Sequence, residues 1–234
     1  MKRRDGRTMQ PGRVRSIRGH AAALATIALW MLAVATPAAA ERFYPALFRT
    51  SEVRSSDEHE FTHWIAMLDR QVSEDANGDA PCTPAGPRAA CAVREWLDFI
   101  AAERGHEPMA QLAEVNAHLN RHRYILDVVN YGIANYWATP REFAVNNGDC
   151  KDFAVAKYFT LRRLGWAVAD LRVVVLQDMN LQVPHAVTVV YVGDRAYLLD
   201  NQIRDVVPAD AVRHYRPFYS INEAHWWLHI AKSQ

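Results

Sequence analysis

The chain has 234 residues, of which half are hydrophobic, and it carries 27 Lys and Arg against 26 Asp and Glu. Seven of the basic residues but only one acidic residue fall in the first 40 positions, so the remainder carries a formal charge near −5. A net-acidic chain lacks the electrostatic footprint of a nucleic-acid-binding protein. The roughly 190 residues after position 40 are enough for one compact domain with a hydrophobic core.

The first 40 residues are predicted to be a cleavable export signal. Basic residues precede the apolar run AAALATIALWMLAVA, and Ala38 and Ala40 satisfy the small-x-small rule for cleavage before Glu41. The run is short for a bilayer span, and no stop-transfer charges follow it. We therefore expect a signal peptide at 1–40 and a single domain at 41–234.

Three amphipathic helices are predicted next, because apolar residues recur at helical spacing in 56–70, 92–103 and 107–125. Residues 131–149 are predicted to be irregular, since Gly132 and Pro140 interrupt them. A further helix is predicted to begin at Cys150, behind a turn at Gly148 and an N-cap at Asp149, and to end at Gly165.

Three cysteines in an exported chain leave one without a partner. Cys82 and Cys91 are separated by prolines and a glycine that suit a short surface loop, and we expect them to form a disulfide worth about 2–3 kcal/mol. Cys150 is then the free thiol. It lies in the first turn of its helix, where the helix dipole stabilises a thiolate.

The last part of the chain changes to a strand pattern. Residues 171–177, 185–192 and 195–201 are rich in β-branched and aromatic residues and are predicted to be strands. Helices followed by antiparallel strands indicate an α+β fold. Gly193-Asp194 fits a two-residue hairpin turn, which pairs Val192 with Arg195 and sets the register of the last two predicted strands.

In this register His185 pairs with Gln202, and Asp200 lies diagonally opposite on the same face, about 7–8 Å away at the backbone. An imidazole and a carboxylate can meet over that distance. We also expect this face to pack against the helix that begins at Cys150. The other members of the face are Val187, Val189, Tyr191 and Leu198.

A thiol at a helix start, a histidine and an aspartate are the parts of a nucleophilic catalytic triad. Cys150 would attack a carbonyl as thiolate, His185 would carry the proton, and Asp200 would orient the imidazole. Each residue also has an ordinary structural interpretation, and the hypothesis depends on all three occurring in one workable geometry.

The oxyanion of such a reaction needs hydrogen-bond donors. The backbone N–H of Cys150 is one candidate, and the second is left open among Asn146, Asn147 and Trp137. Trp137 is predicted either to pack in the core under a turn at Pro140 or to form part of the cleft wall.

Several segments resemble the bacterial transglutaminase-like cysteine peptidases, in matching order from about residue 110 to 228. They are NYWATPREF, GDCKDFAVAKYFTLRRLGW, PHAVTVVYV, YLLDNQI and YSINEAHWW. Matched motif by motif, the nucleophile of the family falls on Cys150, its histidine on His185 and its acid on Asp200.

The resemblance implies a papain-like or transglutaminase-like α+β fold, with N-terminal helices packed on an antiparallel sheet, and a periplasmic endopeptidase. In one branch of the family the substrate is the N-terminal retention region of a large surface adhesin, cut next to a pair of alanines. That cut disperses a biofilm, and an inner-membrane receptor for cyclic-di-GMP restrains the protease. Contact with a membrane is therefore expected only through partners.

Members of that branch bind calcium through acidic residues on both sides of the cysteine, and here the two positions hold Asp149 and Lys151. A lysine cannot be a calcium ligand, because hard cations take oxygen donors. Asp152, one position further along a helix, points about 100° away. The resemblance alone therefore implies calcium at Asp149, whereas Lys151 on the other side of the cysteine argues against it.

Two other functions use the same residues. An acyltransferase would pass the acyl group from Cys150 to an amine instead of water, because the acyl-enzyme step is shared. A binding or regulatory protein of the same fold would act through partner surfaces without using the triad. We expect the endopeptidase before either alternative.

Overall fold

The computed structural model describes residues 44–232, and the predicted export signal lies outside them. Within the described range no helix combines the length and apolarity needed to cross a bilayer. The range begins with a 3-10 turn and ends with a strand, and its α-helices all precede residue 165. The helices are α1 (Thr62–Asn77), α2 (Arg88–Glu103), α3 (Pro108–Leu119), α4 (Asp127–Asn130), α5 (Pro140–Asn146) and α6 (Cys150–Leu164).

Seven strands form one sheet in which every neighbouring pair is antiparallel, in the order β1-β7-β6-β2-β3-β4-β5. Six of them follow the helices in sequence, and β1 joins the edge beside the last strand. The strands are β1 (Thr50–Ser55), β2 (Leu171–Asp178), β3 (Val183–Val192), β4 (Arg195–Leu199), β5 (Val207–Pro208), β6 (Tyr215–Ile221) and β7 (Trp226–Ala231).

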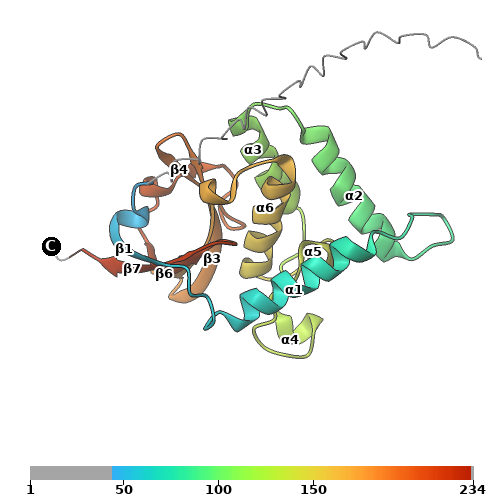
Figure 1. The fold of residues 1–234 in the computed structure, drawn as a ribbon, viewed down its shortest axis with the longest axis horizontal. Helices are drawn as coiled ribbons and strands as arrows, with labels where there is room; N and C mark the ends of the chain where they lie inside the picture. The colour runs from blue at the N-terminus through green and yellow to red at the C-terminus, as the bar shows by residue number, and fades with distance from the viewer. Residues whose placement is uncertain (1–43, 233–234) are drawn as a thin grey trace, which may run out of the picture. The chain divides into compact units, whose positions relative to one another are not determined.

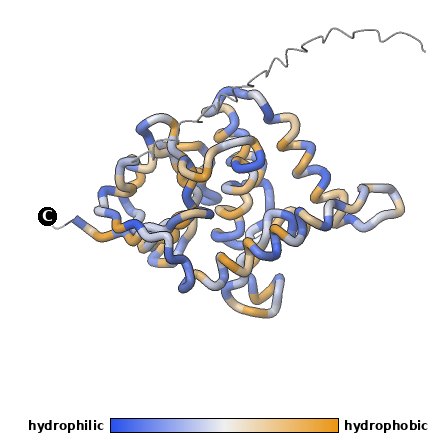
Figure 2. Tube along the Cα trace, in the orientation of Figure 1, coloured by the Kyte–Doolittle hydropathy of each residue, from blue (hydrophilic) through white to orange (hydrophobic). Residues whose placement is uncertain are grey.

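The helix α6 lies between the sheet and the outer helices (Figure 1). Its apolar side chains join one core cluster with the inner faces of α1, α2, α3 and α5. Figure 2 shows hydrophobic and hydrophilic stretches alternating along α1 and α2. The side chains of Phe153, Ala154, Tyr158 and Leu161 are almost fully buried in this cluster. The confirmed architecture is therefore an α+β fold with helices packed on an antiparallel sheet.

The opposite face of the sheet has a core of its own. It is covered by residues 44–49 and by the segment that leads into β6, and its strand residues include Val187, Val189, Tyr191 and Leu198. The prediction that this face packs on α6 is therefore wrong. The helix packs on the other face, where Ala186 and Val190 join the α6 cluster and the Thr188 hydroxyl donates to the Ala154 carbonyl at 2.7 Å.

Other differences concern element boundaries. The helix predicted at 56–70 begins at Thr62, because Ser55 and Asp57 accept the backbone N–H groups of Asp57 and His59 and form a turn instead of a cap. The helix predicted at 107–125 ends at Leu119. The region predicted to be irregular, 131–149, contains α5, which is capped by a reciprocal Thr139–Glu142 pair.

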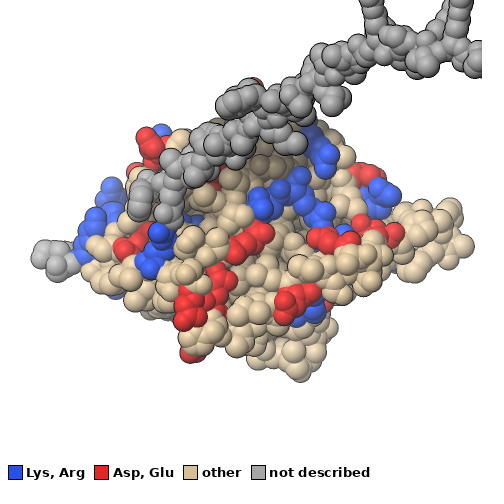
Figure 3. Space-filling model, in the orientation of Figure 1, with Lys and Arg blue, Asp and Glu red and all other residues tan. Residues whose placement is uncertain are grey.

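Basic and acidic side chains are interspersed on the face shown in Figure 3. A pair of salt bridges anchors α5, since Arg141 binds Asp75 near the end of α1 and Asp79 just beyond it, each at 2.6 Å. These contacts hold the segment before α6 against the first helix.

Cys82 and Cys91 form the predicted disulfide, which ties the loop before α2 to the first turn of that helix. We expect the Cys82→Ala/Cys91→Ala double variant to lose about 2–3 kcal/mol of unfolding free energy, because a closed loop of this length restricts the unfolded chain. Urea unfolding with and without dithiothreitol measures it. Reductant should destabilise the wild type by the same amount and leave the stability of the double variant unchanged. A double variant as stable as the oxidised wild type would contradict a stabilising role of the disulfide.

Candidate active site

The first turn of α6 places the free cysteine. Asp149 is the N-cap, and it forms a reciprocal capping box with Asp152, whose carboxylate accepts the Asp149 N–H at 3.0 Å. Gly148 allows this close approach, since a Cβ there would lie 2.5 Å from the Asp152 Cβ. Cys150 follows with a half-buried side chain at the first helical position, where backbone N–H groups have no acceptor within the helix.

His185 and Asp200 meet as the hairpin register requires. Val192 pairs with Arg195, and the imidazole Nε2 lies 2.9 Å from Asp200 Oδ1. Both side chains are almost fully buried. This contact orients the ring and directs Nδ1 away from Asp200.

The Asp200 carboxylate has two further donors. The Gln202 N–H donates to Oδ1 at 2.9 Å, and the Tyr215 hydroxyl donates to Oδ2 at 2.6 Å. Tyr215 belongs to β6, a strand that the sequence analysis did not predict. The carboxylate is therefore held by three hydrogen-bond donors.

A cavity of about 330 Å³ brings Cys150 and His185 together. It lies where β3 begins, and aromatic side chains from the α1 region, the 131–139 segment and β6 form much of its wall: Phe61, Trp64, Trp137 and Tyr219. A larger cavity of about 480 Å³, lined by Arg172 and Trp227 among others, holds neither residue. We place the candidate site in the smaller cavity because it contains the reactive groups.

Burial disfavours a charged imidazole, but the hydrogen bond that the ring donates to Asp200 and the contact with Cys150 outweigh it and raise the pKa of His185 to about 9. Burial also opposes the Asp200 charge. The hydrogen bond and charge of His185, with the other donors, nevertheless keep the pKa of Asp200 below its ordinary value. The pair therefore favours an imidazolium beside a carboxylate at neutral pH.

Trp137 combines its two predicted roles. Its ring packs edge-on against Trp64 in the core, and it also lines the cavity. Its Nε1–H donates to Asn135 Oδ1 at 3.1 Å, so the Asn135 amide is oriented at the cavity wall. Tyr124, a second neighbour that the sequence analysis did not select, interacts with the Cys150 side chain.

Asn147 does not line this cavity. Its side-chain oxygen accepts the Arg123 N–H at 3.0 Å and lies 3.2 Å from His122 Nδ1, and the residue lines a separate cavity. Asn135 instead supplies a side-chain amide to the candidate site. No pattern in the sequence separates Asn135 from its neighbours, because its position follows from the loop that leads to α5.

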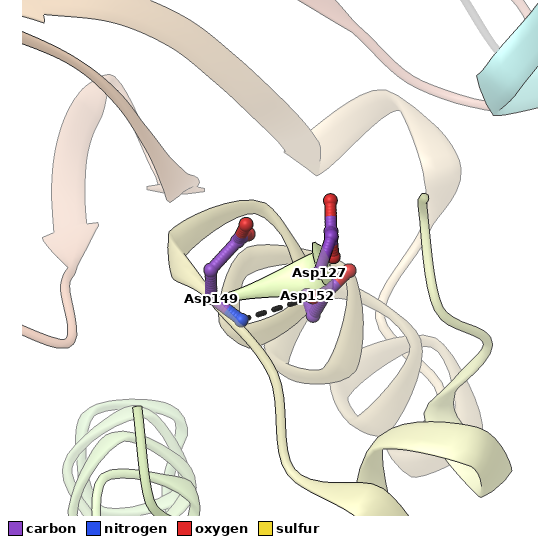
Figure 4. A group of neighbouring side chains, drawn as sticks. All are labelled: Asp127, Asp149 and Asp152. Atoms are coloured by element: carbon purple, nitrogen blue, oxygen red, sulfur yellow. Dashed lines mark hydrogen bonds between the residues drawn. The ribbon is translucent and has the colours of Figure 1, made fainter. Parts of the chain in front are cut away.

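Three carboxylates gather beside the cysteine, from Asp127, Asp149 and Asp152 (Figure 4). One oxygen of each lies within 4.8 Å of the others. The Lys151 ammonium lies among them, 2.6 Å from Asp127, 2.7 Å from Asp149 and 3.5 Å from Asp152. Asp127 is far from Lys151 in the sequence, so the sequence alone does not predict this ion pair.

Burial opposes the charge of Lys151, but Asp152, Asp127 and Asp149 outweigh it and raise the pKa of this lysine. Burial raises the pKa of Asp152 to about 7, although Lys151 acts against that shift. Calcium ligands lie about 2.3–2.6 Å from the ion. A calcium ion on these oxygens would therefore contact the ammonium, so the residues present do not fit calcium at Asp149.

Comparison with known proteins gives a family. The sequence model of the bacterial transglutaminase-like cysteine proteinases (BTLCP) matches residues 86–234. No curated protein matches the chain.

Solved structures of Legionella pneumophila LapG are similar to this chain. One is 29% identical, with a TM-score of 0.56, and the match covers 61% of this chain and 81% of that one. A calcium-bound LapG is 26% identical with the same TM-score, and the match covers 70% and 86% of the two chains. An EGTA-treated LapG is 29% identical, again with a TM-score of 0.56, over 61% and 78%.

The raised pKa of His185 predicts a pH dependence of stability. The ordinary value is 6.5 and the folded value about 9, so the contribution of this residue is complete below pH 6.5 and is lost as the pH rises through about 9. We expect the unfolding free energy to lose about 3 kcal/mol over that window. The loss should be absent from His185→Ala and reduced in Asp200→Asn.

Urea unfolding at pH values from about 6 to 10 measures this effect. The difference between wild type and His185→Ala isolates the residue from other titrating groups. Identical pH slopes in the two proteins would show that His185 does not hold its proton in the folded state.

Proposed function

Because the chain belongs to the bacterial transglutaminase-like cysteine proteinases, and is a cysteine peptidase, we propose that it is an exported thiol endopeptidase with Cys150, His185 and Asp200 as its catalytic residues. One observation supports the choice of these three residues. The free cysteine at the start of α6 and an imidazole held by a buried carboxylate line one cavity.

The first half of the reaction forms an acyl-enzyme. The Cys150 thiolate attacks the carbonyl carbon of the scissile peptide bond, and the carbonyl electrons move onto oxygen. As the intermediate collapses, the C–N bond breaks and the His185 imidazolium gives its proton to the leaving amine. Asp200 keeps the ring oriented throughout through Nε2, which leaves Nδ1 for the proton transfer.

The second half regenerates the enzyme. Water attacks the thioester while neutral His185 accepts a proton from it, and the carboxylic acid product leaves as the C–S bond breaks. Cys150 returns as thiolate beside an imidazolium. The raised pKa of His185 supports this resting ion pair.

Two donors can stabilise the negative oxygen that forms during each step. One is the Cys150 N–H, which projects from the start of α6. The other is the Asn135 amide, because Trp137 occupies its oxygen and leaves its NH₂ group for the cavity. Asn135 takes the place of Asn146, Asn147 and Trp137, the residues among which the sequence leaves the second donor open.

The substrate that we propose is an exported or surface protein, with a large adhesin as the first candidate and release of a biofilm as the consequence. An inner-membrane receptor for cyclic-di-GMP is the corresponding partner. Support comes from the predicted export signal at 1–40 and from the likeness to LapG. Fractionation of cells that express the tagged chain tests the periplasmic location.

The peptidase activity is tested by incubating purified protein with surface proteins of the source cells and sequencing new N-termini. We expect wild-type protein to produce new termini, and Cys150→Ala and His185→Ala to lower the cleavage rate by about 10³-fold or more, because each removes a member of the triad. Unchanged cleavage in Cys150→Ala would reject the assignment.

Two further measurements separate the alternatives. Added labelled amines that enter the products faster than water does would identify an acyltransferase. If Cys150→Ala kept the cellular phenotype of the wild type, the chain would act as a binding protein.

Asn135→Ala is expected to lower kcat by about 10²-fold with little change in KM, since an oxyanion donor acts mainly in the transition state. Trp137→Phe, which removes the N–H that orients the amide, should produce a smaller loss. Asn180→Ala, in an exposed turn outside the cavity, is the matched control. Steady-state kinetics on a cleaved peptide measure the effect, and an unchanged kcat in Asn135→Ala would remove this donor from the mechanism.

A further inference from the structure

Lys151 occupies the centre of the acidic cluster beside the cysteine. Its Nζ contacts one oxygen each of Asp127, Asp149 and Asp152, at 2.6, 2.7 and 3.5 Å. The lysine side chain is only 10% exposed, and the three carboxylates range from buried to half-buried. A buried ammonium with this many anionic neighbours is a fixed part of the structure and differs from a surface ion pair.

The three oxygens have the geometry of a cation cradle. Hard cations such as calcium take carboxylate oxygens from several chain positions, and these oxygens lie within 4.8 Å of one another. Each of the three carboxylates is already in contact with the ammonium. The position that a metal ion would need therefore carries a positive charge supplied by the chain.

We propose that the ammonium group of Lys151 is a built-in cation that takes the place of calcium at the start of α6, so that this peptidase neither requires calcium nor responds to its removal. The LapG relative was solved both with calcium bound and after EGTA treatment. In this chain the positive charge at the start of α6 would be permanent, because it belongs to a side chain and not to a bound ion.

The contacts of the cluster show what such a cation does. Asp127 also accepts the Tyr136 N–H at 2.8 Å, and Asp152 also accepts the Ala138 N–H at 2.9 Å. The ammonium therefore ties residues 127–138 to the first turn of α6. Asn135 and Trp137 lie on this tied segment and line the cavity, so Lys151 is a positioning residue for that wall.

The cluster also retains a capacity for metal that the lysine conceals. Asp127 Oδ1 is buried and has no hydrogen-bond partner within residues 44–232. Replacing Lys151 by glutamate would remove the ammonium and add a fourth carboxylate beside this oxygen. Four carboxylates without a counter-charge repel one another and attract a divalent cation.

The experiment compares calcium binding and thermal unfolding of purified wild type, Lys151→Glu and Lys151→Gln, each with calcium or EGTA. Calcium is the probe in titration calorimetry, and terbium luminescence is a second readout. Lys232→Glu is the control, because Lys232 is exposed and the substitution makes the same charge change.

We expect no saturable calcium binding and an unchanged Tm in wild type and in Lys232→Glu. Lys151→Glu should have a lower Tm in EGTA and gain about 5 °C or more when calcium is added. Lys151→Gln, which keeps a donor but no charge, should lose stability with a smaller calcium response. If Lys151→Glu does not fold in EGTA, its recovery on refolding in calcium gives the same readout.

Two results would overturn the proposal. Saturable calcium binding by the wild type, with a rise in Tm, would show that calcium displaces the lysine. No response of Lys151→Glu to calcium would show that the three carboxylates do not form a cation cradle. The inference concerns the site of the proposed function, but binding and Tm require no peptidase activity, so either proposal can fail while the other stands.

Discussion

The buried carboxylate of Asp152 is the constraint on which the rest of the site depends. A buried anion is costly unless it is hydrogen-bonded and paired with a positive charge. Asp152 satisfies this requirement with the N–H groups of Ala138 and Asp149 and with the nearby Lys151 ammonium. These contacts close the first turn of α6 and hold the preceding loop against it.

The first turn of α6 determines the position of Cys150. Gly148 leaves room for the Asp152 side chain, and Asp149 caps the helix, so Cys150 takes the first helical position. The same carboxylates surround Lys151. One cluster therefore supports the helix start, positions the thiol and orders the aromatic wall of the cavity.

The other half of the site depends on the sheet. Because both faces of the sheet are covered by core clusters, a one-residue slip of β3 would exchange the side chains of the two cores and disrupt the packing of both, so the register is strongly specified. This register brings His185 to Asp200. Tyr215, from the neighbouring end of β6, then fixes the second carboxylate oxygen. The histidine face packs against residues 44–49 and not against α6, so the thiol and imidazole meet at the end of the sheet where β3 begins.

Local signals in the sequence were enough for the cap at Asp149, the end of α6 at Gly165, the Cys82–Cys91 disulfide and the Gly193-Asp194 hairpin, since each depends on residues close together in the chain. The pairing of His185 with Asp200 followed from the hairpin for the same reason. The Thr139–Glu142 cap of α5 was equally local and was overlooked. Only the tertiary structure decided which face of the sheet α6 covers, that Asn135 lines the cavity, and that Asp127 and Tyr215 complete the two charged clusters. Those contacts join elements far apart in the chain, and their partners are selected by packing and by the cost of leaving buried charges unpaired.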